Sequence, residues 1–191
     1  MTRRICFDIC CNYFIDRRHP WLDGPNDARR YLKNEPCRFS AASAYDESIQ
    51  EYLDFTDFNE FFSYLLHADE IITFNGRKYD LVAIENLIGE ESAMKIWSKT
   101  HHDLSGWTEW GLKDSINSCF PDKSADYSIL FEKRKAELIG SGRDDATADA
   151  LANTHRDVTF TYMLFKKYFE SGDSKQTFLD DSKSLIPKND L

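Results

Sequence analysis

The ten residues 71–80, IITFNGRKYD, constrain the fold more than any other part of the sequence. Their first four side chains are apolar or β-branched, which is typical of a buried strand. Asn75-Gly76 follows, and this dipeptide readily adopts positive φ in a tight turn. A helical pattern begins near Tyr79, so we expect Asp80 at the start of a helix, beside the carboxyl end of the strand.

A second acid, Asp8, has a similar place after the apolar run Ile5-Cys6-Phe7. A carboxylate within an apolar strand must be paired, protonated or metal-bound. Two acids at neighbouring strand ends suggest a site for a divalent cation, because Mg²⁺ and Mn²⁺ prefer oxygen ligands. A site of this kind suggests phosphate chemistry.

The apolar pattern along the chain predicts an α/β fold, with a mixed sheet flanked by helices. Strands are expected at 4–11, 39–45, 69–74 and 98–104. Helices are expected at 55–67, with Thr56 or Asp57 as its cap, and at 79–89, 126–138 and 144–170. The 191 residues suffice for one well-buried domain, expected at 1–172 and followed by a polar tail at 173–191.

The net charge of −9 argues against a protein that binds nucleic acid by electrostatics alone. It does not exclude a nuclease, because bound metal ions offset carboxylates locally. Five cysteines without repeated CxxC spacing suggest reduced thiols and no structural zinc site. No signal peptide or long apolar span is visible, so we expect a cytoplasmic protein with no membrane association.

Three sequence motifs are similar to those of a known family. Residues 75–80 match the pattern Asn-x-x-x-(Phe/Tyr)-Asp throughout, and Asp8 follows an apolar strand. Asp157 begins an Asp-Val-x-x-Thr sequence within the last predicted helix, and His102-Asp103-Leu104 is similar to a strand that ends in Asp-Leu. In these motifs and their order, over roughly residues 4–170, the chain resembles the DEDD 3′–5′ exonucleases of the ribonuclease H-like superfamily.

The chain departs from the family pattern at two positions. Cys10 stands where the family has a metal-binding glutamate, and a protonated thiol is a poor ligand for Mg²⁺. Asn153 stands where one subtype has the tyrosine that positions the attacking water. His155, two residues later, is a candidate base if the helix is suitably rotated. A missing ligand could be borrowed from elsewhere, with candidates Glu35, Glu47 and Asp103.

The resemblance implies a ribonuclease H-like fold and a metal-dependent 3′–5′ exonuclease that acts on single-stranded DNA or RNA ends. Asp8, Asp80 and Asp157 would hold two Mg²⁺ or Mn²⁺ ions. Asn75 would contact the substrate. A basic segment is the expected phosphate-tracking surface, because it follows the strand with Asp8; it contains Arg17, Arg18, Arg29, Arg30 and Lys33.

Other interpretations stay open. Taken singly, Asp80 could cap its helix, and Asp157 could pair with Arg156 or Lys166. The departures at Cys10 and Asn153 are also compatible with a catalytically impaired ribonuclease H-like module that binds nucleic acid or a protein partner. A third alternative is a nuclease of another ribonuclease H-like branch that cuts internally.

Overall fold

The computed structural model describes residues 2–13, 37–107, 111–123 and 125–170. Strands within these ranges form one mixed sheet in the order β3-β2-β1-β4-β5. Their bounds are β1 (Arg4–Tyr13), β2 (Cys37–Asp46), β3 (Glu51–Phe55), β4 (Glu70–Thr73) and β5 (Thr100–Asp103). β1, β4 and β5 are parallel, whereas β2 is antiparallel to both β1 and β3. The carboxyl ends of β4 and β5 therefore lie level with the middle of β1, so Asp8 stands within β1 and not at its end as the sequence suggested.

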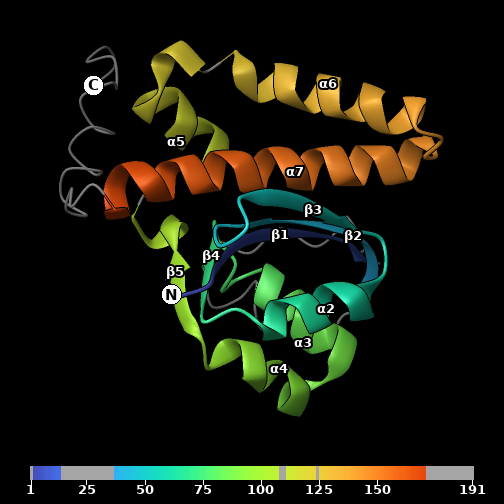
Figure 1. The fold of residues 1–191 in the computed structure, drawn as a ribbon, viewed down its shortest axis with the longest axis vertical. Helices are drawn as coiled ribbons and strands as arrows, with labels where there is room; N and C mark the ends of the chain where they lie inside the picture. The colour runs from blue at the N-terminus through green and yellow to red at the C-terminus, as the bar shows by residue number, and fades with distance from the viewer. Residues whose placement is uncertain (1, 14–36, 108–110, 124, 171–191) are drawn as a thin grey trace, which may run out of the picture.

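Helices cover both faces of the sheet (Figure 1). One face carries α2 (Phe58–Leu66), α3 (Asp80–Ile88) and α4 (Glu90–Trp97). The other face carries α7 (Asp145–Phe165), with α5 (Leu112–Cys119) and α6 (Asp126–Gly140) packed beyond it. The connecting turns are η1 (Leu104–Trp107) and η2 (Pro121–Lys123), and the π-helix η3 (Lys166–Glu170) extends α7.

The strand β1 is central, and both of its faces are buried. Ile5 and Phe7 pack in the core on the side of α2, α3 and α4. Cys6 points the other way and packs against Val158 of α7. Burial on both faces explains the continuous apolar character of this strand. Asp8 has the same parity as Cys6 and therefore faces α7.

The helix α7 approaches the sheet closely, because small side chains line the contact. Ala148 and Ala152 of α7 lie in one buried cluster with Ala41 of β2. The helix begins where the Asp144 carboxylate accepts a hydrogen bond from the Thr147 amide at 3.0 Å. This close contact brings the middle of α7 over β1, where Asp8 lies.

The structure confirms an α/β fold with a mixed sheet flanked by helices. The expected strands appear as β1, β2, β4 and β5, and Asp57 caps α2 as predicted. The predicted helix at 55–67 starts too early, because residues 51–55 form β3, which the sequence pattern did not predict. Its acidic, half-exposed sequence is that of an edge strand, with little apolar signal. The pattern also missed α4, which Gly89 separates from α3 at φ 81°.

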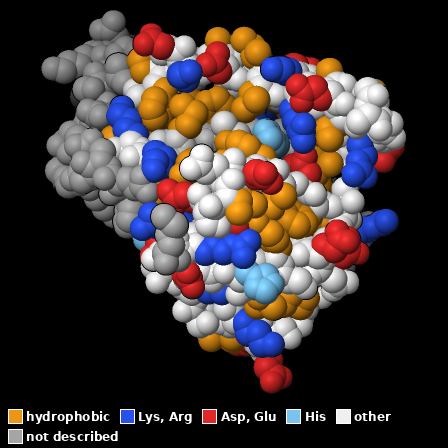
Figure 2. Space-filling view, viewed as in Figure 1, with side chains coloured by type: hydrophobic (Ala, Val, Ile, Leu, Met, Phe, Trp, Pro, Cys, Tyr) orange, Lys and Arg blue, Asp and Glu red, His pale blue; other side chains and the backbone are white. Residues whose placement is uncertain are grey.

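The polar tail expected at 173–191 and the basic segment that contains Arg17 and Arg18 lie outside the described residues. Among the described helices, none is long and apolar enough to cross a membrane. Figure 2 shows basic and acidic side chains interspersed over one face of the molecule. On that face the net charge of −9 is therefore not gathered into a single field.

Candidate functional site

Three acids from distant parts of the sequence come together where β1 meets α7 and the start of α3. They are Asp8 of β1, Asp80 of α3 and Asp157 of α7. Burial raises the pKa of Asp8 well above its usual range, and the negative charges of Asp80 and Asp157 raise it further. Asp8 also shares a hydrogen bond with Asp80. The structure therefore brings together the three predicted metal ligands.

Asp80 is held against β1 rather than used as a helix cap. The N-cap of α3 is Tyr79, and Asp80 Oδ1 accepts a hydrogen bond from the Ile9 amide at 3.2 Å. The side chain is 4% exposed. Burial raises its pKa to about 7, and the charges of Asp103 and Asp157 act in the same direction against the Ile9 hydrogen bond. The helix-capping alternative for Asp80 is therefore wrong.

Asp157 is fixed by two donors from one side. Tyr127 Oη donates to Asp157 Oδ1 at 2.7 Å, and Arg156 Nε donates to the same oxygen at 2.8 Å. The Arg156 guanidinium lies over the Tyr127 ring, 4.3 Å from its centroid. The ion pair considered from the sequence is present, and it does not remove Asp157 from the acid cluster. The Arg156 charge lowers the pKa of Asp8, so this cation partly offsets the cluster.

The turn before α3 explains why Asn75-Gly76 stands ahead of Asp80. Asn75 has φ 68°, in the left-handed region. A Cβ at Gly76 would lie 2.3 Å from Thr73 Oγ1, so the close approach of the chain to Thr73 requires glycine. Asn75 Oδ1 is buried and has no hydrogen-bond partner among the described residues, which leaves an oxygen available to a ligand.

Asp103, at the end of β5, ties this turn to the sheet. Its two carboxylate oxygens accept hydrogen bonds from the amides of Asn75 and Arg77, each at 2.8 Å. Ser105 donates to it as well, through its amide at 3.2 Å and its hydroxyl at 2.8 Å. Four donors thus occupy the Asp103 carboxylate. It positions the loop before Asp80 and is a poor candidate for a borrowed metal ligand.

A second candidate for a borrowed ligand, Glu47, does not join the cluster either. Glu47 follows the end of β2 that pairs with the start of β1. Its carboxylate accepts a hydrogen bond from Tyr162 Oη at 2.9 Å and pairs with Arg4 at 3.3 Å. Glu35 lies outside the described residues.

Cys10 lines a pocket of about 640 Å³ between the sheet and the first turns of α7. Burial raises the pKa of its thiol, and the charges of Asp8 and Asp149 raise it further. The thiol stays protonated at neutral pH and does not replace a hard oxygen donor. Asp149, which lines the same pocket, is the acid that the sequence pattern missed. Its spacing of four from Asn153, and of eight from Asp157, is the signal that could have revealed it.

Two further predicted residues of α7, Asn153 and His155, differ in their surroundings. Asn153 lines the Cys10 pocket, and its side-chain amide donates to the Asp149 carbonyl at 3.0 Å. His155 lies instead against β3. Its ring centroid is 4.6 Å from that of Tyr52, and its Nδ1 is 3.8 Å from Asp54 Oδ1. Two residues along a helix turn the side chain by about 200°, which explains why His155 and Asp157 face different neighbours.

Among the described residues, no group of three or more His, Cys, Asp or Glu side chains is arranged as a ready-made metal site. The chemistry of the acid cluster nevertheless suits a hard cation, since it offers carboxylate oxygens whose charges raise one another's pKa. A scan against models of known protein families finds no match for this chain. A search of the curated proteins finds no significantly similar sequence.

Proposed function

We propose that this protein is a metal-dependent 3′–5′ exonuclease of the DEDD type, which hydrolyses phosphodiester bonds at the ends of single-stranded DNA or RNA. The convergence of Asp8, Asp80 and Asp157 carries the proposal. Buried like charges destabilise a fold unless protons or cations neutralise them. A site that concentrates three carboxylates is costly to maintain, and cation binding is a function that uses it.

Asp8, Asp80 and Asp157 are the residues that would hold Mg²⁺ or Mn²⁺. A cation there would lower the pKa of an attacking water and offset the charge that develops on the phosphate. The chain itself contributes orientation. The Ile9 amide fixes Asp80, while Tyr127 and Arg156 fix Asp157. Such outer contacts keep the carboxylates ready for a ligand.

The architecture supports the same proposal. A mixed sheet flanked by helices is what a ribonuclease H-like fold implies, and the parallel strands β4 and β5 end beside the part of β1 that holds Asp8. Open α/β sheets commonly bind their ligands at the carboxyl ends of the strands. The direction of attack, from a 3′ end, rests on the resemblance of the motifs around Asp8, Asp80 and Asp157.

The test is digestion of 5′-labelled single-stranded DNA and RNA with Mg²⁺, with Mn²⁺ or with EDTA. We expect products that shorten progressively from the 3′ end when a cation is present, and an intact circular single strand, because an exonuclease needs an end. Asp8→Asn should abolish this digestion. Asp122→Asn, at an exposed acid of η2, is its control, because it removes the same negative charge outside the site. Equal digestion in EDTA, or cleavage of the circle, would contradict the proposal.

A second candidate is a non-catalytic module that binds nucleic acid or a protein partner. Two observations favour it: the protonated thiol of Cys10 and the Arg156–Asp157 ion pair, which offsets part of the acidic charge without a metal. This alternative predicts no digestion under any cation and a melting temperature that Mg²⁺ does not change. A melting temperature that rises with Mg²⁺ in wild type and not in Asp8→Asn argues against it.

A further inference from the structure

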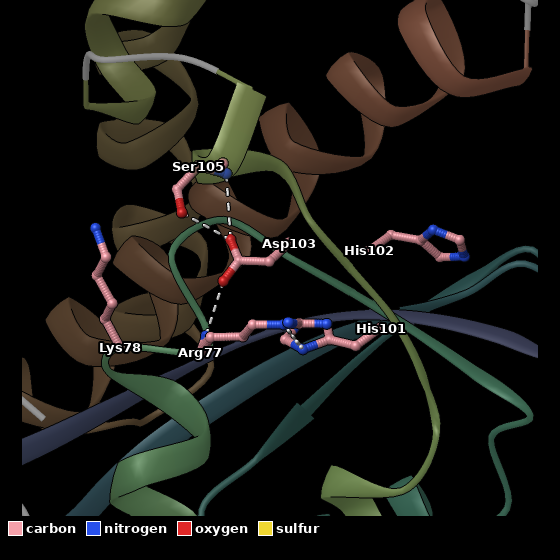
Figure 3. Close-up of a pocket in the computed structure, with 7 residues that line it drawn as sticks. Arg77, Lys78, His101, His102, Asp103 and Ser105 are labelled. Carbon is pink, nitrogen blue, oxygen red and sulfur yellow. Dashed lines mark hydrogen bonds between the residues drawn. The ribbon is translucent and has the colours of Figure 1, made fainter. Parts of the chain in front are cut away.

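A second cavity, of about 400 Å³, adjoins the turn that places Asp80 (Figure 3). Arg77 and Lys78 of the turn line it, together with His101 and Asp103 of β5 and the following Ser105. Asp103 connects the two places, because it lines this cavity and its charge also raises the pKa of Asp80. The cavity is therefore a neighbour of the acid cluster and is built from other side chains.

The charge of this cavity is positive. Arg77 and Lys78 form no ion pair with an acidic side chain among the described residues, and in Figure 3 their side chains extend in different directions from the turn. The Asp103 carboxylate already accepts four hydrogen bonds from neutral donors, and its single negative charge stands against the two positive charges of Arg77 and Lys78. In a protein with a net charge of −9, two cations without an acidic partner are a local attraction for an anion.

His101 orients one of these cations. Thr73 Oγ1 lies 2.7 Å from His101 Nε2, and Arg77 Nε donates to His101 Nδ1 at 3.3 Å. Burial lowers the pKa of His101 to about 4, so the ring is neutral at pH 7 and can accept from Arg77. This contact uses Nε and leaves the two terminal nitrogens of Arg77 for a ligand. A guanidinium presented in this way suits the paired oxygens of a phosphate.

We infer that this cavity, named here the Arg77–Lys78 pocket, binds a phosphate of the substrate strand beside the bond to be cut. The inference rests on the proposed function, because it takes the substrate to be a nucleic-acid strand that passes Asp80. The volume lies within the usual range for ligand pockets. Contact with a backbone phosphate fixes the register of a strand without reading its sequence.

The experiment measures binding of a fluorescent single-stranded oligonucleotide in EDTA, where no cation-dependent cleavage interferes. The double variant Arg77→Gln/Lys78→Gln is compared with the control Lys113→Gln/Lys133→Gln, which removes the same charge from exposed positions on α5 and α6. We expect the pocket variant to bind about tenfold more weakly, with a salt dependence reduced by about one unit of slope. The control should stay within about twofold of wild type. Lys78→Gln alone leaves the Arg77–His101 contact in place, so weaker binding by this variant would not be due to loss of that contact.

The outcomes separate this inference from the proposed function. Suppose that wild type binds the oligonucleotide but does not digest it with Mg²⁺ or Mn²⁺, and that the pocket variant binds more weakly. This result would contradict the proposed exonuclease activity and support phosphate binding by the Arg77–Lys78 pocket. If wild type digests the oligonucleotide and the pocket and control variants bind it equally well, only the inference about the Arg77–Lys78 pocket is contradicted. Absence of oligonucleotide binding by wild type overturns it as well. Inorganic phosphate that binds as tightly as the oligonucleotide would assign the pocket to a free anion instead of a strand.

Discussion

Two acids that lie along β1 have opposite pKa shifts. Beside its first residues lies Asp46, which accepts hydrogen bonds from Arg3 Nε at 2.8 Å and Tyr64 Oη at 2.6 Å. Ser48 donates to it through both its amide and its hydroxyl. Burial by itself would raise the pKa of Asp46, but the hydrogen bonds from Ser48, Tyr64 and Arg3 outweigh it and lower the pKa.

Further along the same strand, Asp8 lies beside Asp80 and Asp157, and burial and like charges raise its pKa. Arg156 offsets part of this charge. The difference in pKa shift distinguishes an acid that stabilises the fold from acids that are available to a ligand. Asp46 has enough donors within the fold to stay charged, whereas the raised pKa of Asp8 favours its protonated form, and we propose that a cation can take the place of that proton.

The largest expected difference between Asp8 and Asp46 is in activity. Asp8→Asn should lower the rate of oligonucleotide digestion by about a hundredfold or more, because it removes a charged ligand from the centre of the cluster. Asp46→Asn should retain activity wherever the protein remains folded. The measurement is the initial rate with Mn²⁺ at a temperature well below both melting points. Similar rates for Asp8→Asn and wild type would remove Asp8 from the site.

The pH dependence of stability should have opposite signs for Asp80 and Asp46. Asp80 has a folded pKa of about 7, above its usual 3.8, so the folded state binds the extra proton between these values. Metal-free stability should therefore fall by a few kcal/mol as the pH rises from about 4 to about 7. The lowered pKa of Asp46 acts the other way, and its contribution is lost as the pH falls below about 4.

Thermal melts in EDTA across this pH range test the sign. In Asp80→Asn the fall between pH 4 and pH 7 should be smaller than in wild type, since Asn does not titrate. Mg²⁺ should restore wild-type stability near pH 7, by about 2.7 kcal/mol at a hundred times the dissociation constant. The assignment fails if Asp80→Asn and wild type have the same pH profile.

Asp46→Asn and Asp8→Asn should also differ in their effect on stability. It should lower the free energy of unfolding by roughly 2 kcal/mol, because it leaves Arg3 and its other donors without a charged acceptor. Asp8→Asn should not destabilise the metal-free protein, since it relieves repulsion with Asp80 and Asp157. Urea denaturation in EDTA gives both values. Equal losses for the two variants would mean that both acids are structural.

The smallest expected effect is at Cys10. Cys10→Glu adds a hard oxygen donor beside Asp8 and should raise Mg²⁺-dependent digestion about tenfold. Cys10→Gln is the matched variant without the charge and should show no gain. Activity equal to wild type in both would indicate that another acid, with Asp149 the nearest candidate, already supplies the ligand. No digestion by wild type or either variant would favour the binding module.

Much of this arrangement could be predicted from local sequence. Residues 71–80 predicted the strand, the turn with Asn75 in the left-handed region and the helix that begins at Asp80. These features depend on neighbouring residues only. The edge strand β3 escaped prediction, because its stability comes from pairing with β2 and not from its own apolar content.

The partners of each charge could not be predicted in the same way. Arg156 and Tyr127 meet at Asp157 through the packing of α6 on α7, and His155 faces β3 through the rotation of α7 on the sheet. Likewise, Thr73 and His101 meet because β4 and β5 are parallel neighbours. Contacts of this kind depend on where whole elements lie, and residue spacing along the chain does not specify that.

The sequence by itself determined the acids and their local settings: Asp8 in an apolar strand, Asp80 after a glycine turn and Asp157 in a helix. The periodicity of apolar residues and the backbone preferences of Asn75-Gly76 act over a few residues, so they can be recognised in the sequence without knowledge of the fold. The tertiary structure decided that these acids share one site, while Asp46, beside the start of β1, is fully paired. Electrostatic energy depends on distance in space and on exclusion of water, and both arise only when the sheet and α7 have packed together.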